Sequence, residues 1–165
     1  MFEERLLAIE LVSRFRGRMT VADWKTFDGW VDGLSNWAET DGLCSQVLGS
    51  LLKREPDLIP RLTAWTRSGN RWRRRASAVA LIPLARRGDF LDAAFGICDR
   101  LAGIRDDMVE KAIGWLLKEA SRTQPQAVVE YLIENRQRLS RLTLRYACEK
   151  LPERLRTRAL RGKSR

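Results

Sequence analysis

Signals for the start of a helix recur along the chain at nearly constant intervals. We expect the first helices of five helix pairs to begin near Glu4, Trp37, Arg71, Asp106 and Leu139. The intervals between these positions are about 33 to 35 residues, which is the spacing of stacked helical repeats. The second helices are expected from about Val21, Pro56, Asp89, Gln126 and Glu153. The spacing therefore predicts an all-α fold, an α-solenoid of about five antiparallel helix pairs.

Local signals agree with a helical chain. Asn36 precedes a helix whose third residue is Glu39, the pattern of a capping box, and Thr20 and Asp23 repeat the pattern. No segment alternates between apolar and polar residues for long enough to indicate a strand. We expect one HEAT-like repeat domain over residues 1–165, with a basic tail from about residue 154. A compact bundle of the same helices is the alternative architecture.

The charge of the chain indicates a polyanionic partner. Its 165 residues include 31 Lys and Arg against 21 Asp and Glu, which gives a net charge of +10. Phosphate contacts release counterions, so each added cation strengthens binding to a nucleic acid. A membrane surface would also attract cations, but membrane binding favours one concentrated basic amphipathic helix. The basic residues here are spread over the whole chain, which favours nucleic acid and no membrane contact.

The absence of histidine limits the chemistry that the chain can perform. It excludes Ser–His and Cys–His nucleophiles, His general bases and His-ligated metals, and we expect no metal and no cofactor. The three cysteines, Cys44, Cys98 and Cys148, are widely spaced among apolar neighbours and are typical of core residues in a reducing compartment. The N-terminus lacks the cationic start of a secretory signal, so we expect a cytoplasmic protein.

One pair of residues is predicted to meet across two repeats. Asp41 and Arg75 are about 34 residues apart, so they occupy equivalent places in successive first helices. Trp37 lies one helical turn before Asp41 and shares its face. These three residues form a candidate site. The alternatives are that Trp37 staples the helix start onto the previous repeat and that Asp41 is an ordinary solvated acid near a helix N-terminus.

A second tryptophan is difficult to explain as a core residue. In "KAIGWLLKEA" one apolar stripe comprises Val109, Ala112, Ile113, Leu116, Leu117 and Ala120. Trp115 lies roughly 130° from the middle of that stripe, in the sector that contains Lys111 and Lys118. We therefore expect Trp115 to be exposed as one wall of a binding site.

Several cations are candidates for binding a DNA backbone. Arg138, Arg141 and Arg145 follow the i, i+3, i+7 pattern in "RLSRLTLR" and are expected to form a basic line on the last first helix. Arg71 and Arg74 in "RWRRR" are further candidates, together with Lys111 and Lys118. Such arginine-rich runs are also typical of solvated surfaces without a ligand.

The first helix is apolar over more than half of its circumference. Its apolar residues include Phe2, Leu7, Ile9, Leu11, Val12 and Phe15. A terminal repeat normally presents a polar outer face, because nothing packs on it. This end is therefore a candidate surface for self-association or for a partner.

Three separated motifs resemble those of the DNA alkylation repair proteins of the AlkD type. They are "NWAETD" with Trp37 and Asp41, "WRRRASA" with Arg75, and "KAIGWLLKEA" with Trp115. The similarity extends from about residue 3 to residue 151. Family members usually have additional N-terminal helices that carry a further aromatic residue near the site, and this chain starts too late to include them.

The resemblance implies a HEAT-like repeat DNA glycosylase that excises N3- or N7-alkylated purines from duplex DNA. In the family, the residues that match Trp37, Asp41 and Trp115 surround the damaged nucleotide, and the residue that matches Arg75 steadies the site and the phosphate backbone. An alkylated purine is already cationic, so it leaves without a general acid, and Asp41 could stabilise the oxocarbenium-like sugar. The alternatives are a non-catalytic scaffold that binds nucleic acid or protein, and a fragment that needs a missing N-terminal part to fold.

Overall fold

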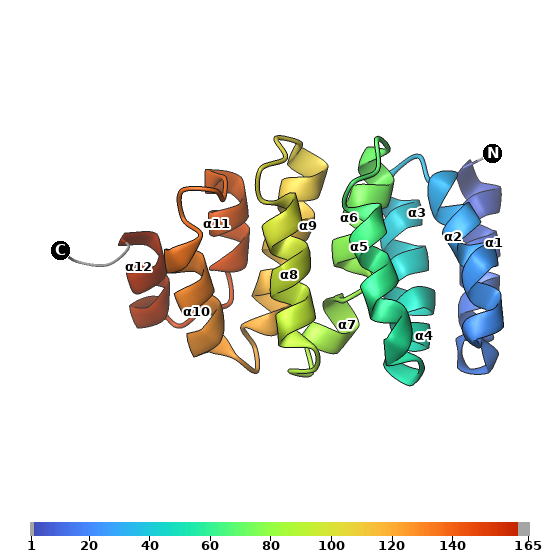
Figure 1. The fold of residues 1–165 in the computed structure, drawn as a ribbon, viewed down its shortest axis with the longest axis horizontal. Helices are drawn as coiled ribbons and strands as arrows, with labels where there is room; N and C mark the ends of the chain where they lie inside the picture. The colour runs from blue at the N-terminus through green and yellow to red at the C-terminus, as the bar shows by residue number, and fades with distance from the viewer. Residues whose placement is uncertain (1, 162–165) are drawn as a thin grey trace.

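A computed structural model describes residues 2–161, and all regular structure in that range is helical. The helices stand side by side in a row, with α1 (Phe2–Arg14) at one end and α12 (Glu153–Arg161) at the other (Figure 1). A compact bundle would bring these two ends together. The α-solenoid of antiparallel helix pairs that the spacing predicts is therefore confirmed, and the bundle alternative is wrong.

Two layers of helices run along the row. The first helices of the five pairs form one layer. They are α1; α3 (Trp37–Asp41), which continues into η3 (Gly42–Leu48) and α4 (Gly49–Arg54); α6 (Arg71–Val79), which is followed by α7 (Ile82–Ala85); α9 (Asp107–Ala120); and α11 (Arg141–Ala147). The second helices are η2 (Val21–Asp23) with α2 (Trp24–Asp32), η4 (Pro56–Arg61) with α5 (Leu62–Trp65), α8 (Leu91–Leu101), α10 (Pro125–Glu134) and α12. The short η1 (Arg16–Arg18) connects the first pair. Successive first helices α1, α3, α6, α9 and α11 pack on each other, so equivalent positions become neighbours.

The predicted helix starts hold to within two residues, and four of the five first helices begin after a residue whose side chain caps the helix. Asn36 accepts a hydrogen bond from the Glu39 backbone N–H at 2.9 Å, and the Thr20 N–H donates to Asp23 at 2.7 Å. The last first helix begins at Arg141, two residues after Leu139, since the Ser140 hydroxyl accepts from the Thr143 N–H at 3.1 Å. A residue before this cap is outside the helix.

The helix that carries Trp37 and Asp41 contains an irregularity that the sequence pattern does not predict. Immediately after Asp41 the backbone widens into the π-helix η3, which ends with the Gly49 N–H donating to the Cys44 carbonyl five residues earlier. π-segments inside α-helices are rare and occur frequently at functional sites. The wide turn places one additional residue between the site and the C-terminal half of the helix.

A continuous apolar core fills the space between the two layers. Trp65 is 1% exposed and stacks on Trp24 at 5.3 Å, and its indole N–H donates to Asp28 at 2.6 Å. The three cysteines are free and buried, as expected for core residues. Between residues 2 and 161, no helix has the length and apolar character needed to cross a membrane.

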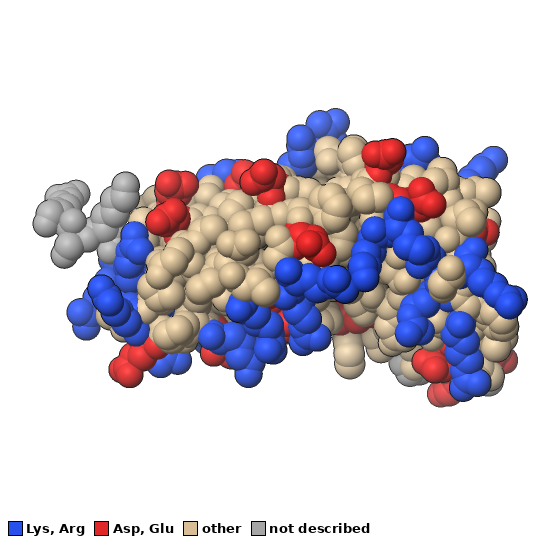
Figure 2. Space-filling model, turned by 90° about the horizontal axis from the view of Figure 1, so that it is seen from below, with Lys and Arg blue, Asp and Glu red and all other residues tan. Residues whose placement is uncertain are grey.

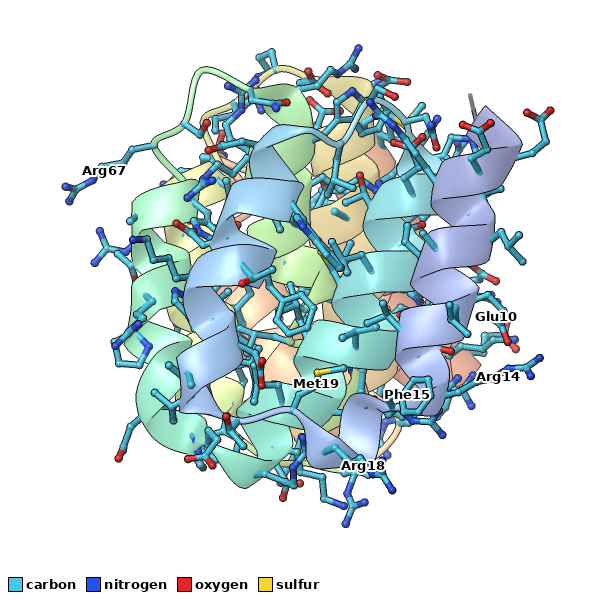
Figure 3. All side chains as sticks on the ribbon, turned by 90° about the vertical axis from the view of Figure 1, so that its right-hand side faces the viewer. Glu10, Arg14, Phe15, Arg18, Met19 and Arg67 are labelled. Atoms are coloured by element: carbon cyan, nitrogen blue, oxygen red, sulfur yellow. The ribbon has the colours of Figure 1, made fainter. Side chains whose placement is uncertain are left out.

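The N-terminal end leaves apolar side chains uncovered. On α1, Leu7 is 70% and Leu11 56% exposed, whereas Ile9 is buried against the next first helix. Figure 3 views this end directly and shows α1 beside α2, with Phe15 and Met19 near the turn that joins them. A hollow of about 340 Å³ with mainly apolar lining lies between the two helices. The apolar character that the sequence assigns to this end is therefore present at the surface.

Candidate functional site

Asp41 and Arg75 form the contact that the repeat spacing predicts. The Arg75 Nε–H donates to Asp41 Oδ1 and its Nη2 donates to Oδ2, both at 2.8 Å. The third nitrogen, Nη1, donates to the Met108 carbonyl of α9 at 2.6 Å. Arg75 thus joins α3, α6 and α9, and its side chain is only 7% exposed against 18% for Asp41. Such a two-pronged pair fixes the orientation of both groups.

A cleft opens beside this ion pair. Its volume is about 270 Å³, and it is lined by Trp37, Arg75, Met108, Lys111, Trp115, Lys118 and Tyr146. Five of the residues predicted from the sequence therefore share one cleft, although they come from three helices. Asp41 is absent from this lining, and it contacts the cleft through Arg75.

The two tryptophans lie differently in the cleft. Trp37 is 58% exposed, which is too open for a side chain that staples a helix start onto the previous repeat. Trp115 is partly buried and packs against the core, so the expectation that it is exposed is wrong in part. One side of Trp115 supports the fold, and the remainder lines the cleft.

The far side of the cleft depends on a glycine. A Cβ atom on Gly114 would lie 2.4 Å from the Cβ of Tyr146 and 3.0 Å from the Thr143 carbonyl oxygen. Only a residue without a side chain allows α11 to approach α9 this closely. The approach places Tyr146 next to Trp115 and Lys118 in the cleft lining, and the Lys118 ammonium lies 6.0 Å from the centre of the Tyr146 ring.

Comparison with known proteins shows the family of the chain. Residues 1–151 match the family model described as DNA alkylation repair enzyme. The chain belongs to this family. It is also similar to a solved structure, "Predicted DNA alkylation repair enzyme from Enterococcus faecalis", with a TM-score of 0.78 and 24% sequence identity. That likeness covers 88% of this chain and 67% of the other, and at this identity it shows a shared fold. No curated protein sequence matches the chain.

In this member of the DNA alkylation repair family, many of the expected backbone-binding cations are engaged within the protein. Arg71 pairs with Asp106 and Asp107 at 2.8 and 2.7 Å. Arg74 is largely buried and donates to the Ser68 and Gly69 carbonyls. These bonds hold the start of α6 to its neighbours, so the two arginines have a structural task in addition to any contact with DNA.

The expected basic line on the last first helix is wrong in part. Arg138 precedes the Ser140 cap, and its guanidinium donates to the Asp99 carbonyl at 2.6 Å. Arg141 and Arg145 do lie on α11, and both are exposed. The line therefore contains two arginines and not three.

Cations are also present away from the cleft. Figure 2 shows Lys and Arg gathered on the lower side of the stack, most densely toward its N-terminal end. A hollow of about 370 Å³ there is lined in part by Arg16, Lys53 and Arg87. Positive charge therefore extends over more of the surface than the cleft and the expected basic line on α11.

Neither a reactive cysteine nor a metal site lies near the site among residues 2–161. Burial raises the pKa of Cys44, and the charge of Asp41 raises it further, so this thiol stays protonated. Among residues 2–161, no group of three or more acids and cysteines is arranged to hold a metal ion. The candidate chemistry therefore rests on Asp41, Arg75 and the aromatic walls.

Two residues of the cleft were not predicted from the sequence. Met108 contributes its backbone carbonyl, which carries no side-chain signal. Tyr146 could have been suspected, because it falls on the last first helix about one repeat after Trp115.

Proposed function

We propose that the protein binds duplex DNA and removes N3- or N7-alkylated purines by hydrolysis of the N-glycosidic bond. The observation that carries the proposal is the Asp41 carboxylate, which Arg75 holds in a fixed orientation beside a cleft with two tryptophans. Membership of the DNA alkylation repair family supports the same conclusion.

The chemistry needs few groups, because alkylation supplies the leaving group. A purine alkylated at N3 or N7 is cationic, so it departs as a neutral base without being protonated by the enzyme. Positive charge then develops on the sugar, and the enzyme has to stabilise that charge. A positioned carboxylate does so by about 2–4 kcal/mol where water is partly excluded.

The hydrogen bonding of Asp41 fits this task. Each carboxylate oxygen accepts one hydrogen bond from Arg75 and keeps further acceptor capacity for the attacking water or the sugar. Arg75 in turn lines the cleft, where its positive charge also attracts a phosphate of the bound nucleotide.

The aromatic walls would recognise the damaged base by its charge. A cation over a tryptophan face gains about 0.5–2 kcal/mol, and an undamaged purine lacks that gain. Trp37 and Trp115 both line the cleft, and Tyr146 adds a third ring. Affinity for undamaged duplex would come from Lys and Arg meeting phosphates, so it should depend strongly on salt and little on sequence.

One observation favours a second candidate, a non-catalytic scaffold that binds DNA. Both Asp41 oxygens are occupied by Arg75, and Asp41 does not line the cleft. A pair of this kind could serve only to join α3, α6 and α9.

Release of free base separates the two candidates. Methylated duplex DNA is incubated with the protein, and the released 3-methyladenine and 7-methylguanine are quantified against a protein-free incubation, with the unmethylated duplex as control. The glycosylase releases methylated base well above the spontaneous rate and nothing from the control. A protein that binds the duplex with steep salt dependence but releases no more base than buffer is the scaffold.

A further inference from the structure

A second hollow lies at the C-terminal end of the stack, between α11 and α12. Its volume is about 370 Å³, and it is lined by Arg136, Arg141, Leu144, Arg145, Cys148, Glu149, Arg156 and Leu160. Four of these eight residues are arginines, and they come from the turn after α10, from α11 and from α12. We call this the arginine hollow.

The positive charge of the arginine hollow is poorly balanced. Its one acid, Glu149, pairs with Lys118 of α9 at 3.1 Å. Among the described residues, Arg141, Arg145 and Arg156 form no ion pair within 4 Å, whereas most arginines of the central repeats do. Arg136 is held by the Ala159 carbonyl at 3.0 Å, which leaves its charge uncompensated.

The apolar part of the hollow strengthens the field of these arginines. Leu144 and Cys148 are buried, and Leu160 is 40% exposed at the rim. Burial raises the pKa of Cys148 against the opposing charges of Arg156 and Arg136, so the thiol stays neutral and adds no negative charge. A cleft lined by one sign of charge with low-dielectric walls concentrates counter-ions.

Helix electrostatics account for Arg145, which lies in the last turn of α11, but not for Arg141. Arg141 is the first residue of α11, at the positive end of the helix dipole, where a cation is unfavourable. A basic residue in the last turn of a helix would need no ligand, but Arg141 is at the opposite end. An anion in the hollow would remove both this conflict and the mutual repulsion of the arginines.

We propose that the arginine hollow binds a backbone phosphate of the DNA duplex, as a second anchoring point outside the nucleotide cleft. The two sites are adjacent, because Lys118 lines the cleft, Glu149 lines the hollow, and the two side chains form an ion pair. Arg145 and Tyr146 are also consecutive on α11. Arginine suits a phosphate because its planar fork donates two hydrogen bonds at once. The proposal rests on the DNA-binding half of the proposed function and not on base release.

The test compares two double variants that remove the same charge from the same part of the protein. Arg145→Ala/Arg156→Ala removes two of the four arginines that line the hollow. Arg154→Ala/Arg158→Ala removes two exposed arginines of α12 that do not line it. Binding of an undamaged duplex is measured over a range of salt concentrations, and thermal melting confirms that both variants fold.

The hollow variant should lower the slope of log affinity against log salt by about 1 and weaken binding about tenfold at low salt, since about one counterion is released per phosphate contact. The control should change the slope by less than half as much. Equal changes in the two variants, or an unchanged slope in the hollow variant, would overturn the proposal.

A third variant keeps the proposal testable should the hollow variant fail to fold. Glu149→Gln removes the one acid from the hollow and releases Lys118, so affinity for undamaged duplex should rise severalfold at low salt. An unchanged or lower affinity counts against the hollow. If the protein releases no methylated base but the variants show these binding changes, the glycosylase proposal is rejected and phosphate binding in the arginine hollow is retained.

Discussion

Arginines in two regions of the molecule differ in their burial and in their ion-pair partners. At the centre, Arg75 is 7% exposed, and three of its nitrogens donate to Asp41 and to the Met108 carbonyl. In the arginine hollow, Arg141, Arg145 and Arg156 form no ion pair within 4 Å among the described residues, and the one acid there, Glu149, pairs with Lys118. The central arginine is therefore part of the protein's own framework, and the terminal arginines are available to an external anion.

The difference shows how one net charge serves two purposes. A buried cation is tolerated only with a partner, because removal of that partner leaves an uncompensated charge. An exposed cation needs no partner and contributes to binding when it meets phosphate. The sequence total of +10 does not separate these classes, but the surroundings of each guanidinium do.

The largest effect should follow from removing the acid that pairs with Arg75, which leaves this arginine without an ion-pair partner, like those of the arginine hollow. Asp41→Asn removes the charge opposite Arg75, so base release should fall by about two orders of magnitude or more, the scale for losing a positioned electrostatic group. Affinity for undamaged duplex should stay the same or rise, since a negative charge near phosphate is lost. Single-turnover release from methylated duplex measures the first effect, and a salt titration of binding measures the second.

A matched control for this variant is Asp28→Asn. Asp28 of α2 pairs with Arg73 of α6 at 2.6 Å, but it is outside the cleft. Both variants should lower the free energy of unfolding, with Asp41→Asn costing up to about 3 kcal/mol because Arg75 is buried. Only Asp41→Asn should abolish base release. Equal release by the two variants would show that Asp41 serves the framework alone.

The second effect tests the contact that joins the two regions. Gly114→Ala would force α11, which carries Tyr146 and two arginines of the hollow, away from α9. We expect a loss of about 1–3 kcal/mol in unfolding free energy, because the clash is with backbone and a Cβ atom that cannot rotate away. Chemical denaturation measures it.

Gly96→Ala in α8 is the control for that substitution. A Cβ at Gly96 meets nothing within 4 Å, so alanine should stabilise the helix by about 0.5–1 kcal/mol. A stable Gly114→Ala variant with normal DNA binding would show that the close approach of α9 and α11 is dispensable.

The third effect distinguishes the roles of the two tryptophans that line the cleft. Trp37→Ala should leave the stability nearly unchanged, because the side chain is 58% exposed, but should reduce the preference for methylated over plain duplex about two- to thirtyfold. Trp115→Ala should reduce the preference similarly and should also destabilise the protein, since Trp115 packs on the core. Competition binding and denaturation of both variants measure the two quantities. Unchanged preference in Trp37→Ala would remove it from the site.

Much of the fold follows from the sequence because its signals are local and repeated. The capping residues and the repeat spacing fix where helices start, and the same spacing places Asp41 against Arg75. These predictions need no knowledge of distant contacts. The family motifs lead to the same residues.

The features that the sequence did not reveal depend on tertiary contacts. The π-helix after Asp41 has no compositional signature, and the Met108 carbonyl is a backbone group. Arg138 fits the helical pattern in letters, but the Ser140 cap excludes it from α11. Arg136 and Arg156 join the hollow only because the turn after α10 and the final helix, which packs on α10, lie beside α11.

The smallest effect concerns the exposed apolar surface of α1. Leu7 and Leu11 are exposed on α1, so replacing both with glutamine should change the free energy of unfolding by less than about 0.5 kcal/mol. Ile9→Ala, on the buried face of the same helix, should cost about 2 kcal/mol or more. Denaturation of the monomer distinguishes the two faces.

The same surface predicts where the fold opens first. α1 packs on one side only, whereas α9 contacts both α6 and α11. Backbone amides over residues 2–16 should therefore exchange with solvent faster than those of α9. Self-association through the apolar face would slow this exchange as protein concentration rises, and the Leu7 and Leu11 substitutions would cancel that dependence. Protection of α1 equal to that of α9 in a monomer of proven mass would show that one-sided packing is sufficient at this end.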